Sequence, residues 1–215
     1  MIVDTDRLIQ TLAADNAQRR HSVGTALAMA LLVALPLTVM LMLSTIGLRA
    51  DIRSAMRTPL FDLKFVVTLA LAIPALALSL HLARPEADSR GWAWWLLVPV
   101  VLLLLGAGGE MMWMPERPPM MKRWMGHNAM LCLTTIPLLA LPILAAALLA
   151  LRQGAPSRPA LAGTMAGLLS AGLASTIYGT HCIDDSPLFV ATWYTLATAL
   201  VTAIGALAGA KWLKY

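Results

Sequence analysis

Residues 127–151 read HNAMLCLTTIPLLALPILAAALLAL, which is 25 consecutive positions without an Asp, Glu, Lys or Arg. An α-helix crosses the hydrocarbon core of a bilayer with about 20 mainly apolar residues. This stretch is therefore long enough and apolar enough to span a membrane. It also carries one of the two cysteines of the chain, Cys132, near its beginning.

Five further stretches of the same kind occupy most of the remaining chain, over residues 22–48, 62–83, 92–114, 160–180 and 188–210. The hydrophobic fraction of 59% and the mean hydropathy of +0.75 both exceed the values of ordinary soluble domains. The sequence thus predicts an all-α protein, a six-helix transmembrane bundle over residues 22–215. We expect a short cytosolic amphipathic helix before it, within residues 1–21, and no separate soluble domain.

The basic residues lie between the spans, so the net charge of +5 indicates loops at a membrane surface rather than a nucleic-acid-binding face. Six spans put both termini on one side of the membrane. That side carries nine Lys or Arg residues and the other side seven, which favours cytoplasmic termini. The first 21 residues have no apolar core and no small-residue cleavage site, so they do not form a signal peptide.

The N-terminal segment has the pattern of an amphipathic helix. Asp4 is placed to cap it, and Leu8, Ile9 and Leu12 form an apolar stripe. A helix of roughly a dozen residues is marginal in water, so this stripe needs something to cover it. One interpretation is a helix lying on the lipid surface. The other is a docking helix that binds a cytoplasmic partner.

The two cysteines fall at the same membrane face. Cys132 lies at the head of the fourth span and Cys182 just beyond the fifth, in a polar stretch with His181, Asp184 and Asp185. Thiolates and an imidazole can bind soft metal ions, whereas packing, a structural disulfide and a reversible thiol sensor are the other interpretations. The chain has no zinc-binding spacing and no close cysteine pair of the kind that disulfide-handling enzymes use.

Three further polar residues lie close to the ends of spans. We expect Lys64 to extend its ammonium group to the interface, Glu110 to be solvated there, and His127 to act as an interfacial cap. The middle of the spans is almost free of charge, which weighs against a small metal-ion transporter. That transporter and a membrane thiol-redox protein are the two alternative functions.

The combination of three features resembles one known family. These are the opening TDRLIQTLAAD of residues 5–15 followed by Arg19 and Arg20, the cysteine at the head of the fourth span, and the run HCIDDSPLFVATWY of residues 181–194. Together they are similar to the NrsF-type integral-membrane anti-sigma factors of proteobacteria, and the resemblance covers the whole chain.

The resemblance implies a non-enzymatic regulator in the bacterial inner membrane, with both termini in the cytoplasm and no resident cofactor. Residues 1–21 would hold an extracytoplasmic-function sigma factor. Cys132 and Cys182 would face the periplasm and release that partner under heavy-metal or oxidative stress, with a transient thiophilic metal ion as one signal. The residues themselves add His181 as a third candidate metal ligand, with Asp184 and Asp185 supporting the sensor loop.

Overall fold

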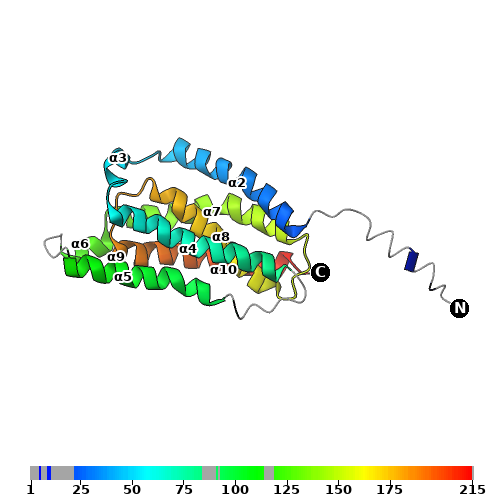
Figure 1. The fold of residues 1–215 in the computed structure, drawn as a ribbon. Helices are drawn as coiled ribbons and strands as arrows, with labels where there is room; N and C mark the ends of the chain where they lie inside the picture. The colour runs from blue at the N-terminus through cyan, green and yellow to red at the C-terminus, as the bar shows by residue number, and fades with distance from the viewer. Residues whose placement is uncertain are drawn as a thin grey trace.

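The computed structural model describes residues 5, 9–10, 22–83, 91, 93–113 and 119–214, and the fold is given for these residues. Within them every regular element is a helix and none is a strand, which confirms the all-α fold class (Figure 1). Thr5, Ile9 and Gln10 are helical and exposed. Asp4, Leu8 and Leu12, the other residues of the predicted docking helix, lie outside the described residues.

Among the described residues, the helices follow one another as α2 (Val23–Thr45), α3 (Ile52–Ala55), α4 (Pro59–Leu82), the 3₁₀-helix η1 (Ala93–Leu97), α5 (Val98–Trp113), α6 (Met120–Met125), α7 (Ala129–Leu151), α8 (Pro159–Gly179), α9 (Pro187–Phe189), the π-helix η2 (Val190–Tyr194) and α10 (Thr195–Trp212). Six segments are long and apolar enough to cross a membrane: Val23–Thr45, Pro59–Leu82, Trp94–Met112, Met120–Leu151, Pro159–Gly179 and Pro187–Trp212. The predicted bundle of six spans is therefore confirmed.

Glycine and proline decide where several spans begin and end. Residue 48 was expected to close the first span, but α2 ends at Thr45 because Gly47 adopts φ +68° and its N–H donates to the Met42 carbonyl. Helix α4 begins at Pro59, three residues before the expected start, since proline suits the first turn of a helix. Gly126, at φ +57°, separates α6 from α7.

The six spans run side by side, with the start of α2 and the end of α10 at one end of the bundle (Figure 1). We call this the terminal end. The short helices α3, α6 and α9 lie at the opposite end, together with the polar loop of residues 180–186, and we call this the polar end. The Cys132 and Cys182 segments both belong to the polar end.

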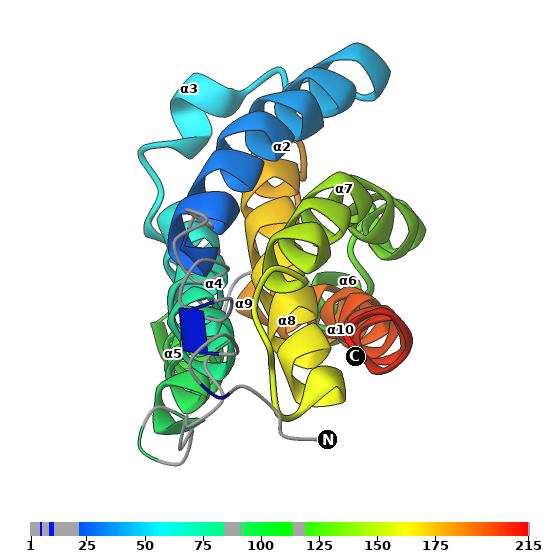
Figure 2. The same ribbon diagram turned by 90° about the vertical axis from the view of Figure 1, so that its right-hand side faces the viewer.

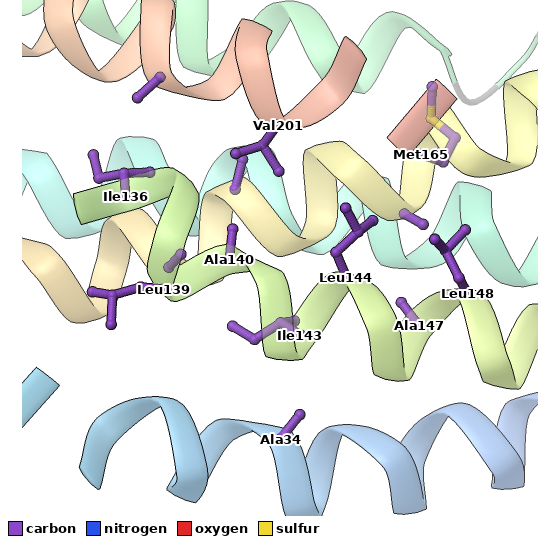
Figure 3. Packing of buried hydrophobic residues seen from close by; sticks show 14 of the residues in the cluster. Ala34, Ile136, Leu139, Ala140, Ile143, Leu144, Ala147, Leu148, Met165 and Val201 are labelled. Carbon is purple, nitrogen blue, oxygen red and sulfur yellow. The ribbon is translucent and has the colours of Figure 1, made fainter. Parts of the chain in front are cut away.

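Helix α8 is the centre of the bundle, surrounded by α2, α4, α7 and α10 (Figure 2). It is the most buried span, because 61% of its most apolar stretch is buried inside the bundle. The corresponding share is only 11% for Trp94–Met112, the peripheral span that contains α5. The small residues of α8 allow this central position because they let neighbouring backbones approach closely. Helix α7 contributes larger aliphatic side chains, among them Ile136, Ile143 and Leu144, to the core that it shares with α2, α8 and α10 (Figure 3).

The contact between α8 and α10 is a seam of glycines. A Cβ atom added at Gly163 would collide with the Gly205 carbonyl oxygen, and one added at Gly209 would lie 2.6 Å from the Gly163 Cα. Gly167 faces Thr202 in the same way, at 2.8 Å from its Cα. Gly163 and Gly167 are spaced four residues apart, as in the small-residue motifs of membrane helices, and they pack against the equally spaced pair Gly205 and Gly209 of the last span.

Candidate functional site

The two thiols lie in one buried cluster at the polar end. Cys132 is in the first turn of α7 and Cys182 follows α8, yet both side chains are 0% exposed and both cysteines are free. Both belong to the same cluster of buried residues. Two residues fifty positions apart are therefore brought together by the packing of α7 against α8.

Three aromatic rings surround this cluster. Tyr178 of α8 and Tyr194 of η2 have ring centroids 5.9 Å apart, and Phe189 lies edge-on to Tyr194 at 6.3 Å. Both tyrosine hydroxyl groups are buried without a hydrogen-bond partner that meets the usual geometry among the described residues, although both lie beside the Cys182 thiol. The thiols are thus closed off from water, and buried hydroxyl groups in such surroundings are costly to leave unpaired.

The backbone that carries Tyr194 is itself irregular. Residues 190–194 form one turn of π-helix, which inserts an extra residue into the start of the last span. Such turns are rare and occur frequently at functional sites. Here the π-turn lies directly beside the two thiols.

Asp184 joins the two cysteine segments. Its carboxylate accepts hydrogen bonds from the backbone N–H groups of His127, at 3.0 Å, and Asn128, at 2.9 Å, at the beginning of α7. Carboxylates favour this position because the first N–H groups of a helix have no partner within it and carry partial positive charge. The Cys182 thiol in turn donates to the Asp184 carbonyl at 3.8 Å. His127, expected as the cap of this helix, is instead an exposed residue whose backbone Asp184 caps.

Asp185 binds the other side of the bundle. Its carboxylate forms salt bridges with Arg49 at 3.0 Å and with Lys64 at 2.5 Å. Arg49 also makes a bidentate pair with Asp51, at 2.7 and 2.8 Å. The two basic side chains are almost fully buried, at 5% and 2% exposed, so their charges need these carboxylates. The expectation that Lys64 reaches the interface is wrong. Helix α4 begins at Pro59, and Lys64 lies on its inward face, where its side chain contacts the Cys182 loop.

The same two cations hold the peptide of Cys182 itself. Lys64 Nζ donates to the Cys182 carbonyl at 2.9 Å, and an Arg49 Nη1 donates to it at 3.2 Å. The Arg49 backbone N–H donates to the Thr180 carbonyl at 3.2 Å, and the His181 Nδ1 lies 3.0 Å from the Gly47 carbonyl. We call Arg49, Lys64, Asp184 and Asp185 the loop clamp, because together they fix the Cys182 loop to α4, α7 and the α2–α3 connection.

Burial and charge set the protonation of this region. Burial raises the pKa of the Cys182 thiol above its ordinary value, although the positive charge of Lys64 acts in the opposite direction. Hydrogen bonds to Asp51 and Asp185 raise the pKa of Arg49, and the hydrogen bond from Arg49 lowers the pKa of Asp51. At neutral pH the loop therefore holds a neutral Cys182 thiol close to the charged guanidinium group of Arg49. A neutral, enclosed thiol is a poor nucleophile and a poor metal ligand until it loses its proton.

Glu110 forms a second polar contact with the loop. Its side chain is buried, accepts a hydrogen bond from Ser186 Oγ at 2.8 Å and lies 3.8 Å from Arg123. The expectation that Glu110 is solvated at the interface is therefore wrong, since α6 and the loop cover it. A hollow of about 340 Å³ opens beside these groups, and its lining includes Lys122, Asp184 and Asp185.

Helix α6 closes the polar end over the last span. Trp124 Nε1 donates to Thr192 Oγ1 at 2.8 Å, and Trp193 Nε1 donates to the Trp124 carbonyl at 3.0 Å. Both contacts fall on the π-turn that carries Tyr194. A rearrangement of the thiol cluster would therefore also affect α6.

The predicted metal-ligating residues do not all converge. Within the described ranges, no three His, Cys, Asp or Glu side chains come together as a set that could hold a metal ion. Cys132 and Cys182 share one cluster, whereas the His181 ring faces Gly47 and Tyr178. In this arrangement the two thiols are the ligands that α7 and the loop bring together.

Sequence reasoning did not assign Arg49, Lys64 or the two tyrosines to the site. One signal is present in the sequence, because a six-span topology puts Arg49, Lys64 and the loop with two aspartates at the same membrane face. Buried charges of opposite sign on one face are expected to pair. No spacing in the sequence indicates which aspartate binds which cation.

Comparisons with known proteins agree on one family. Residues 12–215 match the family model NrsF, described as "Negative regulator of sigma F". The chain is 34% identical over 213 residues to the anti-sigma-F factor NrsF of Caulobacter vibrioides (strain NA1000 / CB15N), a match that covers 97% of this chain and 98% of that protein. It is 32% identical over 184 residues to the probable anti-sigma-F factor NrsF of Azospira oryzae (strain ATCC BAA-33 / DSM 13638 / PS), with 82% of each chain covered. No solved structure matches the chain.

Proposed function

The chain belongs to the NrsF family of negative regulators of sigma F, and from this premise we propose that it is a membrane anti-sigma factor whose two buried thiols control release of its partner. The partner is an extracytoplasmic-function sigma factor, and residues 1–21 bind it through Leu8, Ile9 and Leu12. The protein lies in the bacterial inner membrane with both termini in the cytoplasm. The observation that carries this proposal is the enclosed pair Cys132 and Cys182, at the end of the bundle opposite the start of α2.

The signal acts on the thiols by one of two chemical events. A thiophilic metal ion displaces one proton from each thiol and is held by two thiolates. Alternatively, an oxidant of the peroxide class accepts two electrons and two protons while the two sulfur atoms form one disulfide. Either event replaces two free thiols by a linked pair. The cluster of Cys132, Cys182, Tyr178 and Tyr194 must then pack differently.

The contacts of the Cys182 loop provide a route for that change. Asp184 connects the loop to the start of α7, and Asp185 connects it to Lys64 of α4 and to Arg49 beyond α2. Helix α2 packs against α7 and begins at Val23, directly after the docking segment. A shift of α7 therefore reaches the helix to which the arm is attached. Ile9 is exposed, as a side chain that contacts a partner protein should be.

The energy needed is within reach of a two-thiolate site. Moving a two-state switch from 1:99 to 99:1 requires about 5.5 kcal/mol of differential binding between the states. Soft thiolate ligands bind soft metal ions strongly, while deprotonating the buried Cys182 and opening the cluster take up part of that energy. The resting protein thus responds only to ligands with a high affinity for thiolates.

The test is the association of the full-length protein, in membranes, with the sigma factor encoded beside it. We expect wild-type membranes to retain the sigma factor, and the Leu8→Ala/Leu12→Ala double variant to lose it. Addition of Cd²⁺ should release the sigma factor from wild type but not from Cys132→Ser or Cys182→Ser. Met130→Leu, a lipid-facing change two residues from Cys132, is the matched control and should respond as wild type does.

Two results would overturn the proposal. Absence of binding in every form would exclude the anti-sigma role of the arm. Binding that Cd²⁺ releases equally from wild type and both cysteine variants would retain the arm and exclude the thiols as the sensor.

A further inference from the structure

A basic hollow lies at the terminal end of the bundle, between the last turns of α7 and the end of α10. Its volume is about 500 Å³. Three of the residues that line it are basic, namely Arg152, Lys211 and Lys214, and none of the described lining residues is an Asp or Glu. The thiol cluster and the loop clamp belong to the opposite end, so this hollow is a separate feature (Figure 1).

The charge of the basic hollow differs from that of the hollow at the polar end. The polar-end hollow sets three carboxylates, Glu110, Asp184 and Asp185, against the basic residues Lys122 and Arg123. The basic hollow has no such carboxylate among its described lining residues. The carbonyl groups at the ends of α7 and α10 carry roughly half an elementary negative charge per helix, which the two lysines together exceed. A negatively charged ligand is therefore favoured.

The backbone that carries the two lysines is anchored to the bundle. Leu213, which lies between them, is 1% exposed and belongs to the main core cluster. Its N–H donates to the Gly209 carbonyl at 3.0 Å, which extends the hydrogen bonding of α10 by one residue. Trp212 is 60% exposed, and tryptophan favours the level of lipid headgroups. Lys211 and Lys214, both exposed, are thus held at the level where lipid phosphates lie.

The wall of the hollow on α7 is apolar. Leu149 is 66% exposed and lies three residues before Arg152, and Ala145 lies seven residues before it. At 1.5 Å per residue these positions are about 4 and 10 Å further into the bundle along the helix axis. A ligand that fits the whole hollow has an anionic head and an apolar chain that descends from it.

Charge also distinguishes between the candidate occupants. Residues 1–21 contain three Asp and three Arg, so the arm has no net negative charge to offer. A second copy of the chain in a symmetric contact would place the same basic residues opposite each other. A phospholipid with a choline or ethanolamine group brings a cation, for which the described lining provides no carboxylate.

We propose that this hollow binds one anionic phospholipid, with its phosphate beside Arg152, Lys211 and Lys214 and the first carbons of an acyl chain against Leu149 and Ala145. Phosphatidylglycerol has this chemistry, because its phosphate is negative and its headgroup contains no cation. Basic pockets between membrane-spanning helices bind anionic headgroups in this way. The site is independent of the proposed function, since it requires neither the sigma factor nor a reaction of the thiols.

The test is native mass spectrometry of the full-length protein in a neutral detergent, with dioleoyl phosphatidylglycerol added. Dioleoyl phosphatidylcholine has the same chains and is the reference lipid. We expect one phosphatidylglycerol to bind at least about tenfold more tightly than phosphatidylcholine. Lys211→Gln/Lys214→Gln should weaken its binding roughly 10- to 30-fold, since each basic residue near an anionic lipid contributes about fivefold. Lys211→Arg/Lys214→Arg keeps the charge and should keep the wild-type Kd.

The matched control is Arg53→Gln/Arg57→Gln. It removes two exposed basic side chains at the polar end and so changes the net charge by the same amount. Its phosphatidylglycerol binding should equal that of wild type. Equal losses in this control and in the lysine variant, or equal affinities of wild type for the two lipids, would overturn the proposal.

Three further results would assign the hollow to another occupant and would also overturn the proposal. Displacement of phosphatidylglycerol by inorganic phosphate at the same concentration would identify a free anion. A wild-type dimer that is lost in Lys211→Gln/Lys214→Gln would identify a second copy of the chain. Tighter lipid binding to Asp4→Asn/Asp6→Asn/Asp15→Asn than to wild type would identify the arm, whereas we expect the two affinities to be equal.

Discussion

The polar end and the α8–α10 seam hold the same helices together by opposite means. At the polar end, long side chains from distant segments converge on one loop, as Arg49 and Lys64 do on Asp185. In the seam, Gly163 and Gly205 remove the side chains and let two backbones touch. Backbone contact has one favourable arrangement, whereas ion pairs and a cap can exchange partners. The seam is therefore the fixed part of the bundle, and the polar end is the part that can switch.

The largest expected effect comes from filling the seam. Gly163→Ala places a Cβ against the Gly205 carbonyl, and because the colliding atoms are backbone the helices must separate. We expect a loss of more than about 3 kcal/mol in the free energy of unfolding, at or above the upper end of the usual cost of overpacking. Thermal unfolding in detergent measures it. Gly108→Ala is the control, because nothing lies within 4 Å of its added Cβ. Equal stability of the two variants would show that the seam is not rigid.

The next effect concerns the ion pairs of the loop clamp. Asp185→Asn leaves Lys64 and Arg49 buried beside a neutral group, which we expect to cost about 2–3 kcal/mol, less than for a fully enclosed pair because Asp185 is 20% exposed. Asp51→Asn removes a carboxylate from the same Arg49 but at a 55% exposed position, and should cost under about 1 kcal/mol. Chemical denaturation compares them. A smaller loss for Asp185→Asn than for Asp51→Asn would contradict the role of the clamp.

The same contrast explains what the sequence could predict. The six spans were predictable because the thickness of the bilayer dictates a run of apolar residues of that length. The location of Cys132 and Cys182 at the same membrane face followed from counting spans. The spacing of Gly163 and Gly167 is typical of closely packed membrane helices, but it does not specify that Gly205 and Gly209 are the partners.

The polar end was harder to predict because burial of side chains there depends on tertiary contacts. Lys64 lies within the first turns of its span, where a lysine usually extends to water, and only the covering loop turns it into a buried partner. Glu110 follows the same rule, since Ser186 and α6 exclude the solvent that its position near the helix end suggests. In both cases a contact with the loop of residues 180–186, which is distant in the chain, contributes to the burial.

A smaller effect tests the link between the two cysteine segments. Asp184→Ala removes the carboxylate that caps α7, and loss of a helix cap costs about 1 kcal/mol. Hydrogen exchange should accelerate at the backbone amides of residues 127–128, while the middle of α7 stays protected. Asp62→Ala, at an exposed position in the first turn of α4, is the control and should change the exchange of α7 little. Unchanged exchange at the start of α7 would contradict the cap.

The smallest effect is a dependence of stability on pH. Burial raises the pKa of Cys182 in the folded protein, so the unfolded thiol ionises first as the pH rises. The stability contributed by the neutral thiol is complete below the ordinary pKa of cysteine, about 8.5, and is lost as the pH rises through the higher folded value. Unfolding temperatures of wild type should therefore fall more steeply between pH 8 and about 10 than those of Cys182→Ser. Parallel curves would indicate that Cys182 ionises as freely in the folded protein as in the unfolded chain.

The central claim is that a signal at the polar end releases a partner held at the terminal end. Its most direct test exposes one side of the membrane at a time to a thiol reagent. Fluorescently labelled sigma factor is bound to the protein in oriented membrane vesicles, and a membrane-impermeant organomercurial is added from one side at a time. The account predicts release when the reagent reaches the Cys132 and Cys182 face and retention when it reaches only the face of the arm. Release from the arm face alone, or equal release from both faces in the Cys132→Ser/Cys182→Ser variant, would contradict it.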